Sequence, residues 1–303
     1  MDSAESFREL GYAVLPGWAS PEEVGACRAR ADALLDAFVP STVPSVFSTE
    51  RQAETTDEYF LNSADKVSYF LEAGALDSAG SLTVDKRRAV NKIGHNLHSL
   101  DPVLAPFCRS PKMRRLLTSV AGMSSPAPCQ SMLIFKHPRV GGVVVPHQDA
   151  AFLRTTPDSV VGFWVALEEA TEANGCLWVR IFMPEERLLA HAVVANTLPY
   201  RSPSSQVLPR SHAGGVAARF VLTPERTTKW EGPPPSWDFP GANWVPLPAS
   251  PGDVVLLHGA AVHASAHNAS PSSRYAFSVH FVEADAEWAA DNWLQTGAPH
   301  TSI

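Results

Sequence analysis

Cysteine is scarce in this chain, and the N-terminus has no apolar targeting segment. The 303 residues include four cysteines, at positions 27, 108, 129 and 176, and no two of them form a C-x-x-C pair. This spacing disfavours a zinc ribbon and fits reduced thiols in the cytosol at least as well as a disulfide framework. The first residues, MDSAESFRELGY, carry acidic groups and lack the apolar core of a signal peptide. We therefore expect a cytoplasmic protein.

An excess of positive charge and long apolar runs are also missing. The chain has 24 basic and 31 acidic residues, for a formal net charge of −7. This balance argues against a general nucleic-acid binder and gives no polybasic patch for a membrane surface. No apolar run reaches the ~18 residues of a transmembrane helix, and the C-terminal HTSI is not a peroxisomal signal. We expect a monomer with a small-molecule substrate and with no nucleic-acid or membrane partner.

The first part of the chain predicts helices. Ser20 can cap a helix, Pro21 suits its first turn, and Glu23 completes a capping box. The predicted segments are a helix over 3–10, a helix from Pro21 to about Phe38, a loop over about 41–66, and a helix over 111–120.

From about residue 129 the pattern changes to short β-rich runs, separated by turns rich in Gly, Pro, Asn and Ser. Such runs are typical of a sandwich or jelly roll. We expect one domain over 1–303 that is mainly β with flanking helices, with a helical part over about 1–128 and a jelly-roll core over about 129–285. The predicted strands are Ser131–Phe135, Gly142–Val145, Val160–Leu167, Cys176–Trp178, Asp253–Leu257, Val262–Ala266 and Tyr275–Phe281.

A candidate metal site begins at His147, Gln148 and Asp149, an H-x-D motif after the run VGGVVVP. On a strand, residues i and i+2 point to the same side, so an imidazole and a carboxylate would converge. A third histidine from another strand would complete the facial triad of non-haem Fe(II) oxygenases, which leaves iron positions for a 2-oxo acid and dioxygen. The motif alone is a weak signal, because a surface strand end also produces it.

Two histidines compete for the third ligand position, His258 and His263. His263 alternates with Ser265 and His267, so the three would share a strand face. Arg274 stands eleven residues beyond His263, and a planar guanidinium can bind both oxygens of the distal carboxylate of 2-oxoglutarate. Ser265 can add a hydroxyl hydrogen bond. We therefore favour His263 as the ligand and interpret His258 as a core histidine or a support for the ligands.

These segments also carry a family resemblance. The chain resembles the phytanoyl-CoA dioxygenase family in HQDAAF, VHASAHN, RYAF, DEYFLNSADKVSYF (57–70), NKIGHNLHSLDPV (91–103), QSMLIFKHP (130–138), NGCLW (174–178) and EWAADNWLQ (287–295). The resemblance implies a double-stranded β-helix core, a cupin-like jelly roll wrapped by helices. It also implies Fe(II), O2 and the co-substrate 2-oxoglutarate. The implied reaction decarboxylates 2-oxoglutarate to succinate and CO2 and hydroxylates a small apolar or acyl substrate.

The resemblance assigns roles to individual residues as well. The iron ligands match His147, Asp149 and His263, and the residues that bind the 2-oxoglutarate carboxylate match Arg274 and Ser265. Further co-substrate contacts match Lys92, Met132 and Trp164, and Gln148 is expected to touch the co-substrate through its backbone or side chain.

Several of these residues have plain structural alternatives. Lys92 could be a solvated charge, and Met132 and Trp164 could be ordinary core residues, since pocket walls and core often coincide. His95 and His98 lie in the NKIGHNLH motif and could line a substrate pocket. His95 is the better candidate of the two, with a hydrogen-bonded core histidine as its alternative.

Residues 179–206 interrupt the resemblance. Their removal gives NGCLWVLPRSHAGG, which restores the family pattern. Val179 requires a GTN codon and Gln206 can be encoded by CAG, so the segment has the ends of an in-frame intron. We interpret 179–206 as a retained intron or non-native insertion. The alternative is a surface loop, although one this long is unusual in a compact domain.

Two other function classes remain open. A zinc- or manganese-dependent cupin-like hydrolase or isomerase can use similar ligands, but it needs no anchor such as Arg274 for a 2-oxo acid. A non-catalytic binding protein on the same fold usually lacks part of the triad, which is complete here. An acyl-CoA substrate would favour a basic rim, which the net charge of −7 does not support.

Overall fold

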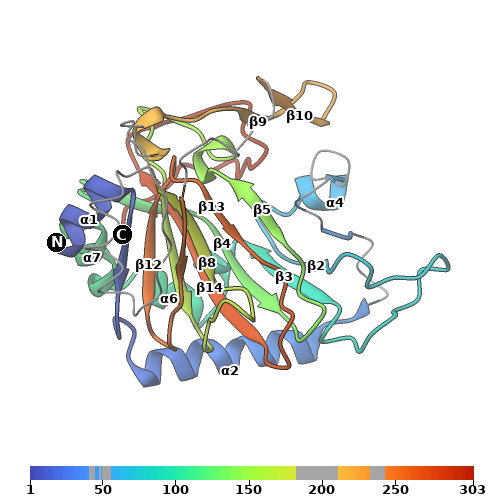
Figure 1. Ribbon diagram of the computed structural model, residues 1–303. Coiled ribbons are helices and arrows are strands. Elements are labelled where there is room, and N and C mark those ends of the chain that lie inside the picture. Colours follow the sequence, from blue (N-terminus) through green and yellow to red (C-terminus); the bar gives the residue numbers. More distant parts are fainter. Residues whose placement is uncertain (41–44, 48, 50–55, 182–210, 233–242) are drawn as a thin grey trace.

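Two β-sheets face each other across the interior of the protein (Figure 1). The computed structural model describes residues 1–40, 45–47, 49, 56–181, 211–232 and 243–303. The larger sheet has seven strands in the order β1-β12-β7-β14-β4-β3-β2, and the smaller has four in the order β11-β8-β13-β5. All their strand pairs are antiparallel. The fold is therefore the expected jelly roll with flanking helices.

The strands of the larger sheet come from both halves of the chain. They are β1 (Tyr12–Leu15), β2 (Val67–Leu71), β3 (Val90–His95), β4 (Pro126–Lys136), β7 (Val161–Ala166), β12 (Val254–His258) and β14 (Arg274–Glu283). The smaller sheet consists of β5 (Val144–His147), β8 (Leu177–Ile181), β11 (Asn243–Leu247) and β13 (His263–Ser265). Outside the two sheets, the two-residue strands β6 (Thr155–Thr156) and β15 (Glu287–Trp288) pair with each other. The four-residue strands β9 (Arg219–Leu222) and β10 (Thr228–Glu231) form a second pair.

The strands of the larger sheet alternate between two environments. On β14 the odd-numbered residues, from Tyr275 to Phe281, belong to the apolar core that includes the helices. The even-numbered residues Arg274, Ser278 and His280 line a cavity between the sheets instead. Because successive side chains of a strand point to opposite faces, one strand both packs the core and supplies the polar groups of the cavity.

The longest helix, α2 (Pro21–Ala37), runs along the edge of the sheets (Figure 1). Its capping box is formed as predicted: the Glu23 backbone N–H donates to Ser20 Oγ, and the Ser20 N–H donates to the Glu23 carboxylate. The apolar face of α2 packs into the core through Val24, Leu34 and other residues. In the part of the chain that the structure describes, the other α-helices are α1 (Ser3–Leu10), α4 (Glu58–Leu61), α5 (Leu97–Leu100), α6 (Leu104–Cys108) and α7 (Pro111–Ser119).

The description of 1–128 as a helical part needs correction. This part also supplies β1, β2 and β3, which extend the larger sheet at both of its edges. The expected loop over 41–66 contains the short helix α4, whereas 41–44, 48 and 50–55 lie outside the described residues. Periodicity missed these strands because they form by pairing with later parts of the chain: β1 with β12, β3 with β4, and β2 in turn with β3.

The strand predicted to end at Trp178 continues through Val179 and Arg180 to Ile181, the end of β8. Val179 pairs with His263 on one side and with Val245 on the other. The first three residues of the proposed insertion therefore take part in the smaller sheet. The rest of 179–206 lies outside the described residues.

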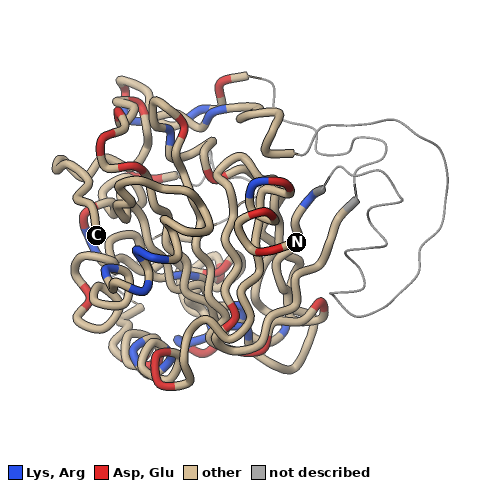
Figure 2. The backbone as a smooth tube through the Cα atoms, turned by 90° about the vertical axis from the view of Figure 1, so that its left-hand side faces the viewer, with Lys and Arg blue, Asp and Glu red and all other residues tan. Residues whose placement is uncertain are grey.

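Charged residues of both signs are interspersed over the helices and loops (Figure 2). Among the described residues, no helix has the length and the apolar character needed to cross a membrane.

Candidate metal centre and co-substrate pocket

Three potential ligands converge between the sheets, namely His147, Asp149 and His263. Their ligand atoms all lie within 4.8 Å of one another. His147 ends β5 and His263 begins β13, and the two residues are direct cross-strand partners. Asp149 was expected on the strand of His147, but it opens a 3-10 turn, Asp149–Ala151. The carboxylate therefore reaches the histidines because the chain turns after β5, and not because of strand alternation.

Both histidines are held in the orientation that a metal ligand needs. The ring Nδ1 of His147 lies 2.9 Å from the Val145 carbonyl oxygen, and that of His263 lies 3.1 Å from the Ala261 carbonyl oxygen. A carbonyl only accepts, so each Nδ1 carries the proton and each Nε2 presents its lone pair. Both Nε2 atoms lie 3.6 Å from Asp149 Oδ1. Such backbone support is characteristic of metal-binding histidines.

The protonation states also suit a divalent cation. Burial lowers the pKa of His263 to about 4, which keeps its imidazole neutral. Burial alone would raise the pKa of Asp149, but the neighbouring imidazoles of His280 and His263 hold it well below its usual range. A neutral imidazole and an ionised carboxylate are the forms that bind metal.

His280 is a site residue that sequence reasoning missed. Its Nε2 lies 3.2 Å from Asp149 Oδ2, so this imidazole holds the carboxylate oxygen that faces away from His147 and His263. A signal for it was present, because His280 shares the even-numbered face of β14 with Arg274. Nothing in the sequence placed Asp149 opposite that face.

Gln148 lines the cavity, but its side chain is engaged with the backbone. Its Nε2 donates to the carbonyl oxygens of Gly215 and Ala260 at 2.8 and 2.7 Å. Its Oε1 accepts from the Ala217 N–H at 2.9 Å. The side-chain amide thus ties together the segments on either side of the metal ligands.

Arg274 is the buried cation at one end of the cavity. The residue is 1% exposed, and its Nη2 donates to Ser265 Oγ at 3.4 Å. The Ser265 hydroxyl itself donates to the Gly175 carbonyl oxygen. The Nε and Nη1 groups of Arg274 have no hydrogen-bond partner among the described residues. Burial lowers the pKa of this guanidinium to about 10, so it stays charged at neutral pH.

The three remaining predicted co-substrate residues line the same cavity. The Arg274 guanidinium carbon lies 5.6 Å from the centre of the Trp164 ring. Met132 and Trp164 both pair with Ser278 in the sheet, one from each side. Lys92 is buried rather than solvated, with its Nζ 3.2 Å from the centre of the Phe47 ring, and burial lowers its pKa well below the usual value.

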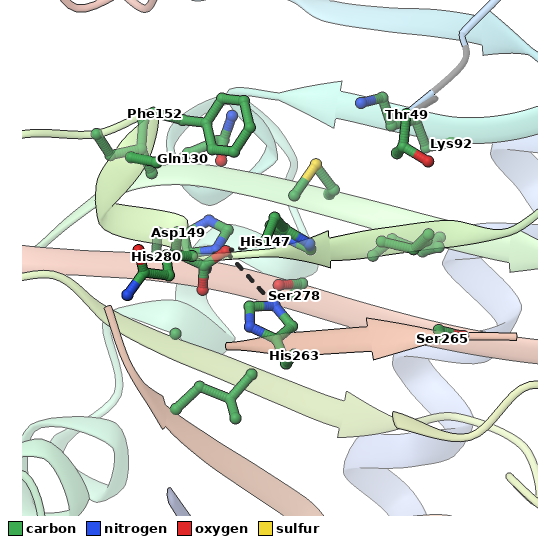
Figure 3. Close-up of a pocket in the computed structure, with 18 of the residues that line it drawn as sticks. Thr49, Lys92, Gln130, His147, Asp149, Phe152, His263, Ser265, Ser278 and His280 are labelled. Atoms are coloured by element: carbon green, nitrogen blue, oxygen red, sulfur yellow. Dashed lines mark ion pairs between the residues drawn. The ribbon is translucent and has the colours of Figure 1, made fainter. Parts of the chain in front are cut away.

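The cavity has a volume of about 400 Å³ and extends to both sides of the triad. Figure 3 shows Lys92, Thr49 and Ser265 toward one end, and Gln130 and Phe152 toward the other. The strand register agrees, because Lys92 pairs with Ile134, whereas His280 pairs with Gln130. We name the side of Arg274 and Lys92 the arginine end, and the side of Gln130 and Phe152 the aromatic end.

The structure also separates the other candidate histidines. His258 lies outside the ligand cluster, with its ring 5.2 Å from that of His212 and 6.0 Å from that of Phe7. His95 lines the cavity, as preferred from the sequence. His98 is buried elsewhere and hydrogen-bonded to Ser131.

Solved structures with the same architecture include enzymes that are described as dependent on alpha ketoglutarate. The carbocyclase SnoK from nogalamycin biosynthesis is 19% identical, with a TM-score of 0.61, over 99% of this chain and 92% of its own. The epimerase SnoN, solved with Fe3+, alpha ketoglutarate and nogalamycin RO, is 18% identical, with a TM-score of 0.58, over 99% of this chain and 93% of its own. At these identities the likeness shows the fold.

Relatives by sequence are considerably more similar. A phytanoyl-CoA dioxygenase of Arabidopsis thaliana is 38% identical over 295 residues, covering 97% of this chain and 93% of the relative. Phytanoyl-CoA dioxygenase domain-containing protein 1 of Bos taurus is 38% identical over 301 residues, covering 96% and 93%. The family model for phytanoyl-CoA dioxygenase (PhyH) matches residues 7–276. With its facial triad of His147, Asp149 and His263, the chain belongs to the phytanoyl-CoA dioxygenase family of non-haem iron, 2-oxoglutarate-dependent dioxygenases.

Proposed function

We propose that this protein couples the decarboxylation of 2-oxoglutarate to the hydroxylation of a small apolar or acyl substrate. In the balanced reaction, 2-oxoglutarate, O2 and a C–H bond give succinate, CO2 and a C–OH group. Iron held by the triad would supply the redox chemistry that activates dioxygen. The observation that carries the proposal is Arg274, a buried cation whose Nε and Nη1 groups have no partner among the described residues.

A buried guanidinium whose Nε and Nη1 are both unpartnered is unfavourable, because burial removes their hydration and no described residue replaces it. A carboxylate offers two oxygens in the plane of the guanidinium fork. Arg274 and the triad line one cavity, so a dicarboxylate can reach Arg274 with one end and the metal with the other. A hydrolase or isomerase needs no such distal anchor, and a binding protein needs no prepared triad.

The other residues of the arginine end have distinct roles in this proposal. Ser265 accepts a hydrogen bond from Arg274 and so orients the guanidinium. Trp164 and Met132 form apolar walls along the carbon chain of the co-substrate. Lys92, whose Nζ lies beside the rings of Phe47, Phe60 and Phe70, adds a further hydrogen-bond donor for a carboxylate. Gln148 positions the backbone between the first two ligands.

The proposal is tested by measuring succinate formed from 2-oxoglutarate with Fe(II), and 2-oxoglutarate binding to the Mn(II)-loaded protein by calorimetry. We expect His147→Ala to lose metal binding and turnover. We expect Arg274→Ala to retain the metal and to weaken 2-oxoglutarate binding by roughly 10- to 100-fold, the loss of a charge-assisted hydrogen bond to a carboxylate. His267→Ala, at an exposed histidine near the same strand, should behave as wild type.

The contrary result is a folded, metal-loaded protein that does not bind 2-oxoglutarate and forms no succinate, whether or not residues 179–206 are present. Equal 2-oxoglutarate affinity in wild type and Arg274→Ala would also remove the basis of the proposal.

A further inference from the structure

His95, at the aromatic end of the cavity, has a defined tautomer. The Ser63 hydroxyl donates its proton to the Phe60 carbonyl oxygen at 2.5 Å. The same Ser63 Oγ lies 2.8 Å from His95 Nδ1. Because the hydroxyl proton is already used, Oγ must accept from an N–H at His95 Nδ1. His95 Nε2 is therefore the unprotonated nitrogen, which can only accept a hydrogen bond.

This acceptor is buried and has no partner. His95 is 0% exposed, and its Nε2 has no hydrogen-bond partner among the described residues. Burial, reinforced by the nearby Lys92 and His280, keeps its pKa well below the usual value, so the ring is neutral. A buried polar atom that lacks a partner is costly unless a ligand supplies one.

Aromatic rings surround His95 and continue along the cavity wall. The rings of Phe60 and Trp293 lie 5.4 and 5.1 Å from the His95 ring, and 4.4 Å from each other. Phe152 and Trp230 form a second pair, with their ring centres 5.4 Å apart. Trp230 comes from the β9–β10 hairpin, so this hairpin forms part of the wall of the aromatic end.

Few lysine and arginine side chains line the cavity. Among the described residues that line the cavity, the lysine and arginine side chains are Lys92 and Arg274, and of these Lys92 Nζ also lies 5.5 Å from the centre of the Phe60 ring. The buried Gln130 amide, which pairs across the sheet with His280, offers a further neutral donor and acceptor. Because burial lowers the pKa of Lys92 well below its usual value, this end offers a phosphate or other strong anion little positive charge.

The cavity is also small for two ligands. Its volume of about 400 Å³ is near the lower end of the range of roughly 300–1,000 Å³ for sites that hold one drug-sized molecule. On the proposed function, the arginine end holds the five-carbon chain of 2-oxoglutarate. The remaining space suits a compact substrate.

We propose that His95 is a specificity-determining residue whose Nε2 accepts a hydrogen bond from the hydroxyl or N–H group of a compact, uncharged substrate with an aromatic or other apolar body. This inference rests on the proposed function and names the substrate class for the same site. The substrate binds between the Phe60–Trp293 and Phe152–Trp230 pairs and directs its donor to His95. The triad then lies between this substrate and 2-oxoglutarate.

Three probes with the same ring system test this proposal: 2-naphthol, which has a donor; 2-methoxynaphthalene, which lacks one; and 2-naphthyl phosphate, which is anionic. Their affinities are measured by calorimetry on the full-length protein loaded with Mn(II) and 2-oxoglutarate. We expect wild type to bind 2-naphthol roughly tenfold more tightly than 2-methoxynaphthalene, because the ether leaves His95 Nε2 unsatisfied. We expect the phosphate to bind more weakly than 2-naphthol.

Two variants at His95 and one matched control assign the preference to this nitrogen. His95→Leu removes the acceptor and should bring the 2-naphthol to 2-methoxynaphthalene affinity ratio close to one. His95→Gln places an amide oxygen near the position of Nε2 and should keep part of the preference, which a merely structural role would not explain. His98→Leu changes a buried histidine of the same segment that does not line the cavity, and should leave the ratio unchanged.

The proposal is overturned if wild type binds neither naphthalene probe, binds both equally, or prefers the phosphate. It is also overturned if His98→Leu lowers the ratio as much as His95→Leu does. If His95→Leu fails to fold, a complete loss of preference in folded His95→Gln is the overturning result. The titration of 2-oxoglutarate into the same Mn(II)-loaded protein is independent of these ratios, so failure there identifies failure of the proposed function.

Discussion

Asp149 divides its two carboxylate oxygens between different neighbours. Oδ1 lies 3.6 Å from the Nε2 atoms of both His147 and His263, and Oδ2 lies 3.2 Å from His280 Nε2. Gly162 adjoins the same oxygen, and a Cβ at this position would lie 2.9 Å from Oδ2. The imidazole and the glycine together crowd Oδ2, so Oδ1 is the oxygen with which Asp149 would hold a metal.

Replacing His280 should therefore weaken metal binding without removing a ligand. We expect His280→Asn to lower Mn(II) affinity by roughly 10- to 100-fold, the usual effect of losing a residue that orients a ligand. Calorimetric titration with Mn(II) measures this change. Ser278→Ala, on the same face of β14, is the control and should keep wild-type affinity. Unchanged affinity in His280→Asn would show that Asp149 holds its position unaided.

At this scale the sequence predicted the residues whose chemistry has few alternatives. The H-x-D motif, His263 and Arg274 could be chosen from residue type and spacing. His280 could not, because strand alternation gives the face of a side chain but not what lies across from it. The neutral, accepting state of His95 depends on Ser63 and on the Phe60 carbonyl oxygen, a set of contacts that no sequence pattern contains.

Among the elements, strand β8 contains the first three residues of the segment 179–206. Its Val179 is buried between β13 and β11, and Arg180 beside it is 2% exposed. If 179–206 were removed, Val207 would follow Trp178 and take the place of Val179. Leu208 would then take the place of Arg180, so an apolar side chain would stand where a buried guanidinium stands now.

We expect deletion of 179–206 to preserve metal binding and cooperative unfolding, because Val207 and Leu208 can continue the strand after Trp178. Urea unfolding and Mn(II) titration measure the two effects. Arg180→Leu in the full-length chain is the control that separates the strand substitution from the change in loop length. A deletion variant that does not fold would show that 179–206 belongs to the native structure.

The elements also differ in how well the sequence predicted them. The start of α2 depends on contacts between Ser20 and Glu23, three residues apart, and local sequence contains that information. Strands β2 and β3 depend on joining the edge of a sheet built around β4 and β14. These two strands form because they pair with other segments of the sheet, and residue periodicity alone did not distinguish them from loop.

Across the whole molecule, buried histidines couple the stability of the fold to pH. Burial lowers the pKa of His98 to about 3 and that of His137 to about 4. In the unfolded chain both would titrate near 6.5. Between these values the unfolded state binds more protons than the folded state, so the free energy of unfolding falls as the pH falls below about 6.5.

For His137 the loss should reach roughly 3 kcal/mol once the pH is near 4, since each pKa unit corresponds to about 1.4 kcal/mol. Urea unfolding at several pH values between 7.5 and 4.5 measures the slope. His137→Phe keeps an aromatic ring against Phe135 and Tyr275 and should reduce that slope. A variant with the wild-type slope would contradict the assignment of this proton uptake to His137.

The hydrogen bonds of the Gln148 side-chain amide affect how the length of the chain after β8 can change during evolution. Gln148 holds Gly215, Ala217 and Ala260, while Ser211 joins the Arg180 carbonyl oxygen to the Val262 N–H. The chain that leaves β8 is therefore fixed again beside the metal ligands as soon as it returns. Because the entropy cost of a longer loop grows only slowly with its length, this connection can lengthen or shorten over evolution without moving the iron ligands.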